Sequence, residues 1–189
     1  MIVARKQLKI RAAEYDRMAD AGVFDSDRRR MELVGGHLYE MPPIGTPHLI
    51  VVTRLQRRFE RAIDEDLRVL VQQPLIVDQF DEPQPDLIIL RRPLGSQKPR
   101  SRDCLVVIEV SDSSYDDDRN VKLPAYLRGG VPLVWIVNIR QGLLEEYDQL
   151  PGPDEAGGRR YYPGETMPRV EDVTVDVGML LANLPTSAR

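Results

Sequence analysis

Cysteine, histidine and long apolar runs are scarce in this chain. Its 189 residues include 1 Cys and 2 His, so an internal disulfide is impossible and a zinc site built from several Cys and His ligands is not expected. No apolar run approaches the roughly 20 residues that a membrane-spanning helix needs, and the N-terminus lacks the apolar segment of a signal peptide. These absences predict a cytoplasmic protein with no membrane partner.

A surplus of positive charge is lacking as well. The formal net charge is -4, which argues against a protein that coats nucleic acid without specificity. A nucleic-acid enzyme remains compatible with this charge, because acids gathered at a metal site are neutralised by the metal. Hydrophobic residues make up 42% and charged residues 30% of the chain, as in ordinary globular proteins. The length suits one domain over residues 1–189.

Several familiar motifs are absent or incomplete. The serines at positions 111, 113 and 114 have no histidine base nearby, which argues against a serine nucleophile. The run Asp116–Asp118 lacks the spacing of a calcium-binding loop. His48 opens a predicted helix and is interpreted as an exposed histidine, although a contact with phosphate is an alternative. Tyr126 and Trp135 are interpreted as core residues.

Apolar patterning predicts a mixed sheet with helices on its faces. Short runs rich in β-branched residues indicate strands, and apolar residues at helical spacing indicate amphipathic helices. The step from the strand at 104–110 through a helix at 118–128 to a strand at 133–138 resembles a right-handed crossover unit. The fold class is therefore α/β or α+β, with a mixed central sheet flanked by helices. The other predicted elements are helices at 12–23, 46–64 and 176–184, a Gly-Gly hairpin at 31–41, and strands at 68–78, 86–90, 143–148 and 159–162.

One buried strand is interrupted by a carboxylate. Glu109 stands between the apolar run Leu105–Ile108 and Val110, and a buried carboxylate costs several kcal/mol unless something pairs with it. Asp86 opens another apolar strand. If the two strands are neighbours, both carboxylates can reach the same end of the sheet, where a hard cation would offset their repulsion. Mg²⁺ is such a cation, because it binds through one or two carboxylates plus water and substrate phosphate.

A lysine on the next helix can complete such a site. Lys122 follows Glu109 in the chain, and its ammonium group can orient a water or stabilise charge that develops on a phosphate. Asp118 lies one helical turn before Lys122 on the same face and can hold it in place. Simpler alternatives exist for each residue alone: Asp86 as a turn residue, Glu109 as the partner of a buried arginine, and Asp118 with Lys122 as a surface ion pair.

The same stretches carry a family resemblance. From about Glu32 to Tyr147 the chain resembles the Uma family of restriction endonucleases, which is assigned to the Pro-Asp…(Asp/Glu)-X-Lys nuclease superfamily. The blocks that carry the resemblance are Met31-Glu32-Leu33-Val34-Gly35-Gly36, His48, Pro85-Asp86-Leu87, Val107-Ile108-Glu109-Val110-Ser111-Asp112-Ser113-Ser114, Asp118-Arg119, Val121-Lys122-Leu123-Pro124-Ala125-Tyr126, Gly129-Gly130-Val131-Pro132 and Trp135-Ile136-Val137.

The resemblance implies a restriction-endonuclease-like fold and a set of site residues. Asp86 and Glu109 match the two metal-binding acids, and Lys122 matches a catalytic lysine that the family takes from the following helix. In the superfamily pattern the lysine would stand at the position of Ser111, so the chain departs from that pattern. Glu32 matches an additional acid, and the resemblance makes Asp118 an acid near the lysine.

These observations together predict an endonuclease that depends on Mg²⁺ or Mn²⁺ and hydrolyses DNA phosphodiester bonds. Basic residues on the 54–61 helix face and in the 91–102 loop are expected to guide DNA. Cutting both strands of a duplex needs two catalytic units, so a homodimer is expected. Two alternatives stay open: a nucleic-acid or protein binding module without turnover, and a metal-dependent phosphodiesterase that acts on RNA or nucleotides.

Overall fold

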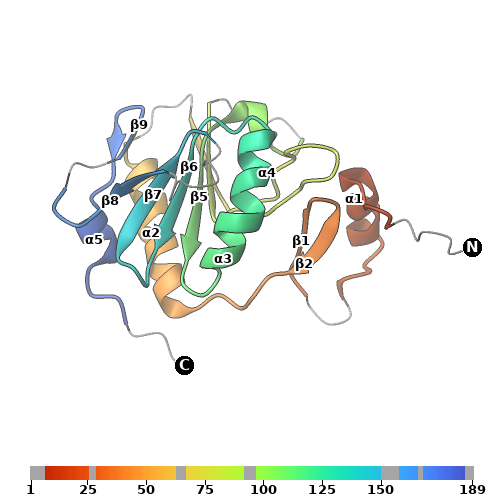
Figure 1. Ribbon diagram of the computed structural model, residues 1–189, viewed down its shortest axis with the longest axis horizontal. Coiled ribbons are helices and arrows are strands. Elements are labelled where there is room, and N and C mark those ends of the chain that lie inside the picture. Colours follow the sequence, from red (N-terminus) through yellow and green to blue (C-terminus); the bar gives the residue numbers. More distant parts are fainter. Residues whose placement is uncertain are drawn as a thin grey trace, which may run out of the picture.

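The computed structural model describes residues 7–25, 29–62, 67–91, 97–149, 158–165 and 168–185 (Figure 1). Its helices are α1 (Ala12–Asp20), α2 (Thr46–Glu60), α3 (Tyr115–Asp117), α4 (Leu123–Arg128) and α5 (Val177–Leu181), with a 3₁₀ turn at Ser101–Asp103 and a π-helical segment at Asp118–Lys122. Its strands are β1 (Met31–Val34), β2 (His37–Glu40), β3 (Arg68–Val71), β4 (Leu87–Leu90), β5 (Cys104–Ser111), β6 (Val134–Asn138), β7 (Leu143–Tyr147), β8 (Arg159–Tyr161), β9 (Arg169–Val170) and β10 (Val173–Thr174).

A six-stranded sheet forms the centre of the molecule, in the order β3-β4-β5-β6-β7-β8. Strands β5 and β6 are parallel, and the other neighbouring pairs are antiparallel. The chain passes from β5 to β6 through α3, the π-helical segment and α4, as the crossover pattern predicts. This mixed sheet with flanking helices confirms the predicted fold class.

Helices cover both faces of the sheet (Figure 1). Helix α2 packs Val52, Leu55 and Phe59 against one face, in a cluster that includes Ile108 and Trp135. On the opposite face, Leu123 and Tyr126 of α4 pack against alternate residues of the same strands. Burial on both sides explains why the strands read as continuous apolar runs rather than as alternating patterns.

The β1–β2 hairpin is a separate two-stranded sheet beside the central one. Gly35 and Gly36 form its turn with φ angles of 62° and 80°, which glycine adopts without a steric penalty. Leu33 packs with α1 in a small cluster of its own, and a bridge between Leu33 and Glu82 connects the hairpin to the body. The hairpin therefore contacts the loop that precedes β4, and through this loop it is attached to the central sheet.

Several predicted boundaries are wrong. The helices expected at 12–23 and 176–184 are shorter, at Ala12–Asp20 and Val177–Leu181. The strand expected at 68–78 ends at Val71, because Gln72 takes a left-handed φ of 49° and Pro74 has no N–H to offer a neighbouring strand. The helix expected from Asp118 begins at Tyr115 instead, although regular α-helix does follow the π-helical segment, from Leu123 on. Within the described residues, no helix combines the length and apolarity that would let it cross a membrane.

Candidate active site

Asp86 and Glu109 meet at one end of the central sheet. Strands β4 and β5 are antiparallel neighbours with Leu87 opposite Ile108, so the residue before β4 lies beside the residue after Ile108. The Asp86 carboxylate accepts a hydrogen bond at Oδ2 from the Val110 backbone N–H, 2.9 Å away. The expectation that these two strands are neighbours is confirmed.

Lys122 lies among three carboxylates. Its Nζ is 3.3 Å from Oε1 of Glu109, 3.4 Å from Oε1 of Glu32 and 3.2 Å from Oδ1 of Asp118. All four side chains are buried. The alternative that Asp118 and Lys122 form a surface ion pair is wrong, and so is the alternative that Glu109 pairs with a buried arginine.

Ser111 stands where the superfamily pattern has a lysine. In this protein its hydroxyl holds Asp118, the acid beside Lys122. Ser111 donates a hydrogen bond to Oδ2 of Asp118 at 2.8 Å, and Ser114 donates to the same oxygen at 2.7 Å. With Oδ2 held by two hydroxyls, Oδ1 faces Lys122. Ser111 therefore contributes to placing the ammonium group that arrives from the helix.

The helix that carries Asp118 and Lys122 is π-helical between them. The Leu123 N–H donates to the Asp118 carbonyl five residues earlier. Pro124 follows directly; it lacks an N–H, and its ring would clash with the carbonyl four residues before it in a regular α-helix. The wider turn avoids this conflict, and such single π turns often occur at functional sites.

His48 and Tyr126 belong to the site, although the sequence interpretation left them out. His48 Nε2 lies 2.9 Å from Oδ2 of Asp86, and the Tyr126 hydroxyl donates to Oε1 of Glu109 at 2.6 Å. The prediction that His48 is exposed is wrong, since its side chain is only 15% exposed. A signal was present: with Val52, Leu55 and Phe59, His48 shares the apolar face of α2. Tyr126 is a core residue as predicted, and its hydroxyl also forms the hydrogen bond to Glu109.

Burial controls the ionisation of this cluster. Desolvation raises the pKa of Glu109 well above its usual value, against the opposing effect of Lys122. Desolvation also raises the pKa of Glu32. Burial alone would lower the pKa of Lys122, but Glu109, Asp118 and Glu32 together raise it well above its usual value. The cluster thus carries more acid than one lysine can neutralise.

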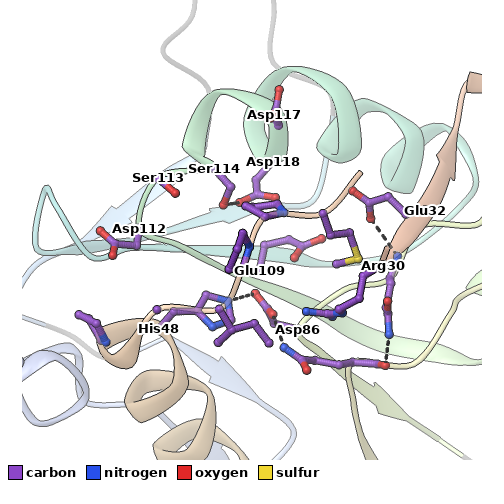
Figure 2. A pocket seen from close by; sticks show the side chains of 18 of the residues that line it. Arg30, Glu32, His48, Asp86, Glu109, Asp112, Ser113, Ser114, Asp117 and Asp118 are labelled. Atoms are coloured by element: carbon purple, nitrogen blue, oxygen red, sulfur yellow. Dashed lines mark hydrogen bonds and ion pairs between the residues drawn. The ribbon is translucent and has the colours of Figure 1, made fainter. Parts of the chain in front are cut away.

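A pocket of about 570 Å³ opens onto these residues. Figure 2 shows Glu109 and Asp86 on the sheet side, Asp118 on the helix side and Glu32 on the hairpin side. The segment between β2 and α2 forms a further wall, with Met41, Pro42 and Ile44. All five predicted site residues line this pocket: Glu32, Asp86, Glu109, Asp118 and Lys122.

A divalent metal fits the chemistry of this donor set. Three carboxylates contact one ammonium group, and a fourth, that of Asp86, lines the same pocket. Hard oxygen donors with excess negative charge are what Mg²⁺ and Mn²⁺ bind. The described residues contain no group of three His, Cys, Asp or Glu side chains already arranged around one point. The two acids proposed as ligands, Asp86 and Glu109, would therefore need water or substrate oxygens to complete the coordination, as is usual for Mg²⁺.

The basic residues expected to guide DNA are in part engaged elsewhere. Arg54 donates to the carbonyls of Leu180 and Ala182, each at 2.8 Å, and Arg58 donates to the Thr174 carbonyl at 2.8 Å. Lys98 of the 91–102 loop pairs with Asp16 and Glu82. These contacts show that each of the three side chains also holds the fold together, so a role in guiding DNA stays a prediction for them. Positions 92–96 of the loop lie outside the described residues.

Comparisons with known proteins agree with the fold and indicate a family. A family model, Uma2, described as "Putative restriction endonuclease", matches residues 12–180. The crystal structure of a "putative nuclease belonging to DUF820" from Anabaena variabilis is similar in fold, with a TM-score of 0.65 and 10% identity over 84% of this chain and 93% of that one. No curated protein matches. Family and fold support a nuclease, as predicted. Since the family model spans most of the chain, this protein belongs to the Uma2 family.

Proposed function

We propose that this protein is a metal-dependent endonuclease that hydrolyses DNA phosphodiester bonds. The observation that carries the proposal is the contact of one buried ammonium group, that of Lys122, with Glu32, Glu109 and Asp118, beside Asp86 on the floor of an open pocket. Such an excess of buried acid costs stability, so a functional cation is its simplest explanation.

Asp86 and Glu109 would hold Mg²⁺ or Mn²⁺. When bound, the metal supplies polarisation of the scissile phosphate and a water with a lowered pKa. His48 and the Val110 N–H hold Asp86 in one orientation, as groups around metal ligands commonly do. Tyr126 does the same for Glu109.

Lys122 would stabilise negative charge that develops on the phosphate, or position the attacking water. Glu32 and Asp118 hold its ammonium group at the pocket. A duplex cut on both strands needs two such sites, so we extend the proposal to a homodimer of single-domain chains. Sedimentation at equilibrium should then give twice the chain mass, and a monomer that still cuts both strands would remove that extension.

Incubation of the purified protein with Mg²⁺ or Mn²⁺ and a panel of plasmid DNA, short duplexes, single strands and RNA tests the activity. We expect cleavage of DNA that requires the metal and falls roughly 100-fold or more in Glu109→Gln and Asp86→Asn. Glu145→Gln is the matched control, because Glu145 is a buried acid of the same sheet that lies outside the pocket.

Cleavage that survives Glu109→Gln would remove the proposed mechanism. Turnover of RNA in preference to DNA would change the substrate class and leave the site as described. A protein that binds metal through Asp86 and Glu109 yet cleaves none of these substrates would favour a binding module on the same fold.

A further inference from the structure

Arg30 differs from the other long cationic side chains of the pocket. Lys122 contacts three carboxylates, and Arg140 lies 3.2 Å from Oδ1 of Asp112. Arg30 lines the same pocket and is half-buried, yet among the residues that the structure describes its guanidinium has no hydrogen-bond or ion-pair partner. A partly desolvated guanidinium with five unused donors is poorly accounted for by folding alone.

The backbone at Arg30 is fixed while its side chain points into the pocket. The Arg30 carbonyl accepts a hydrogen bond from the Met41 N–H at 2.8 Å, which closes the base of the β1–β2 hairpin. Figure 2 shows the side chain extending from there toward the space above Asp86. The guanidinium is therefore presented to whatever occupies the pocket beside the two acids proposed as metal ligands.

The acids of the pocket floor are already held by other donors. Asp86 accepts from His48 and the Val110 N–H, and Glu109 accepts from Tyr126 and Lys122. Glu32 accepts from the Gln84 N–H at 3.1 Å and contacts Lys122. None of these acids is the partner of Arg30, so within the part of the chain that the structure describes its guanidinium is open to an anion that enters the pocket.

We propose that Arg30 binds a phosphate of the nucleic-acid substrate, next to the phosphodiester that is cut. The proposal rests on the proposed nuclease function and adds a substrate contact that the metal site alone does not supply. The planar guanidinium matches phosphate with two parallel N–H···O bonds. Its place between the hairpin and the metal-binding acids also positions the strand across the pocket.

Equilibrium binding measures this contact directly. Fluorescence anisotropy of a fluorescein-labelled 12-nucleotide DNA, single-stranded or duplex, in Ca²⁺ with the probe checked for integrity on a gel, gives the dissociation constant at several salt concentrations. For Arg30→Gln we expect roughly tenfold weaker binding and a salt slope reduced by about 1, as for the loss of one phosphate contact. Arg30→Lys keeps the charge, so its dissociation constant should lie between those of wild type and Arg30→Gln, and its salt slope should equal that of wild type.

Arg29→Gln is the matched control, because it removes the same charge from the neighbouring exposed residue, which does not line the pocket. Its dissociation constant should stay within about twofold of wild type. Equal thermal midpoints of Arg30→Gln and wild type show that binding, and not folding, has changed; where Arg30→Gln folds poorly, Arg30→Lys and Arg29→Gln provide the comparison.

Two results separate this inference from the function on which it rests. A wild-type protein that binds and cleaves DNA, with Arg30→Gln and Arg30→Lys equal to it in affinity and salt slope, overturns the assignment of Arg30 alone. A wild-type protein that neither binds nor cleaves any probe overturns the proposed function and this assignment with it.

Discussion

At the scale of single residues, the buried carboxylate of Glu109 affects both the stability of the protein and its proposed function. Its pKa and that of Glu32 are raised above the usual value of 4.5, chiefly by burial. Through these two groups the folded state binds more protons than the unfolded chain between about pH 4.5 and the raised pKa values, so their contribution to the unfolding free energy falls as the pH rises through that window. If Glu109 holds a metal as proposed, the ionised carboxylate that the metal needs is the form that destabilises the metal-free protein.

Glu109→Gln should therefore stabilise the metal-free protein while removing activity. At pH 8 we expect the unfolding free energy to rise by about 1 kcal/mol. The neutral amide can still accept the hydrogen bond from Tyr126, and unlike the carboxylate it need not be protonated when it is buried. Well below pH 4.5 the difference from wild type should vanish, since Glu109 is then protonated in the folded and the unfolded state. Urea unfolding at pH 8 and at about pH 3.5 measures the difference.

The exposed acid Glu60 provides the control, and Glu60→Gln should change stability little at either pH. A Glu109→Gln variant that is less stable than wild type at pH 8 would show that the ion pair with Lys122 outweighs the desolvation of the carboxylate. Excess Mg²⁺ should raise the stability of wild type, by about 2.7 kcal/mol at a hundred times its dissociation constant.

Much of the site follows from local pattern, and the rest depends on the path of the chain. Asp86 and Glu109 stand at the ends of two apolar runs, and such runs pair in a buried sheet; the spacing of Asp118 and Lys122 places them on one helix face. Glu32 reaches them through the docking of a hairpin, which no local pattern encodes. Its assignment came from the family resemblance.

At the scale of the elements, the π-helical segment sets the relative position of Asp118 and Lys122. Local propensity predicts a kink or a break near Pro124. It does not predict that a π-helical turn is the form that accommodates the proline ring. Nor does it reveal that Ser111 and Ser114 hold Asp118, because those bonds depend on how the helix docks at the end of β5. The strands are simpler, since burial on both faces leaves a signal in the sequence itself.

Pro124→Ala should separate activity from stability at this helix. Alanine restores an N–H and removes the ring, so residues 118–128 can take the regular α-helical register, which turns Lys122 relative to the sheet. We expect cleavage to fall roughly tenfold or more, as small displacements of catalytic groups do, with a thermal midpoint equal to wild type or higher. Rates at saturating metal and thermal melts measure both.

Pro132→Ala is the companion variant, because Pro132 lies in the exposed turn after the helix and should leave cleavage unchanged. Wild-type rates in Pro124→Ala would mean that the π-helical segment is not needed for the position of Lys122.

At the scale of the whole molecule, the C-terminal residues complete the core under α2. Val173, Val177 and Leu180 belong to the same apolar cluster as the helix, and Arg54 reaches from α2 to the carbonyls at the end of α5. The sequence shows Arg54 as part of a basic surface. Its structural role, which is to bind the carbonyls at the end of α5, depends on a segment more than a hundred residues away in the chain.

Arg54→Ala should accordingly destabilise the fold and leave DNA binding unchanged. Loss of two hydrogen bonds from a charged donor is worth about 1 to 3 kcal/mol, read from urea unfolding, whereas affinity at temperatures where the variant is folded should match wild type. Arg57→Ala, on the exposed face of the same helix, should cost little stability. A loss of DNA affinity in Arg54→Ala at full folding would support its predicted role in guiding DNA.

The hairpin with Arg30 at its base and Glu32 in its first strand is a two-stranded sheet of its own, while Asp86, Glu109 and Lys122 belong to the central sheet and its crossover helix. The pocket is thus assembled from two structural units. If Arg30 binds substrate phosphate as proposed, substitutions in the hairpin other than at Glu32 should change that contact while Asp86 and Glu109 stay in place. A library confined to residues 29–31 and 33–45 would therefore vary the hairpin side of the pocket while Glu32 and the acids of the central sheet stay unchanged.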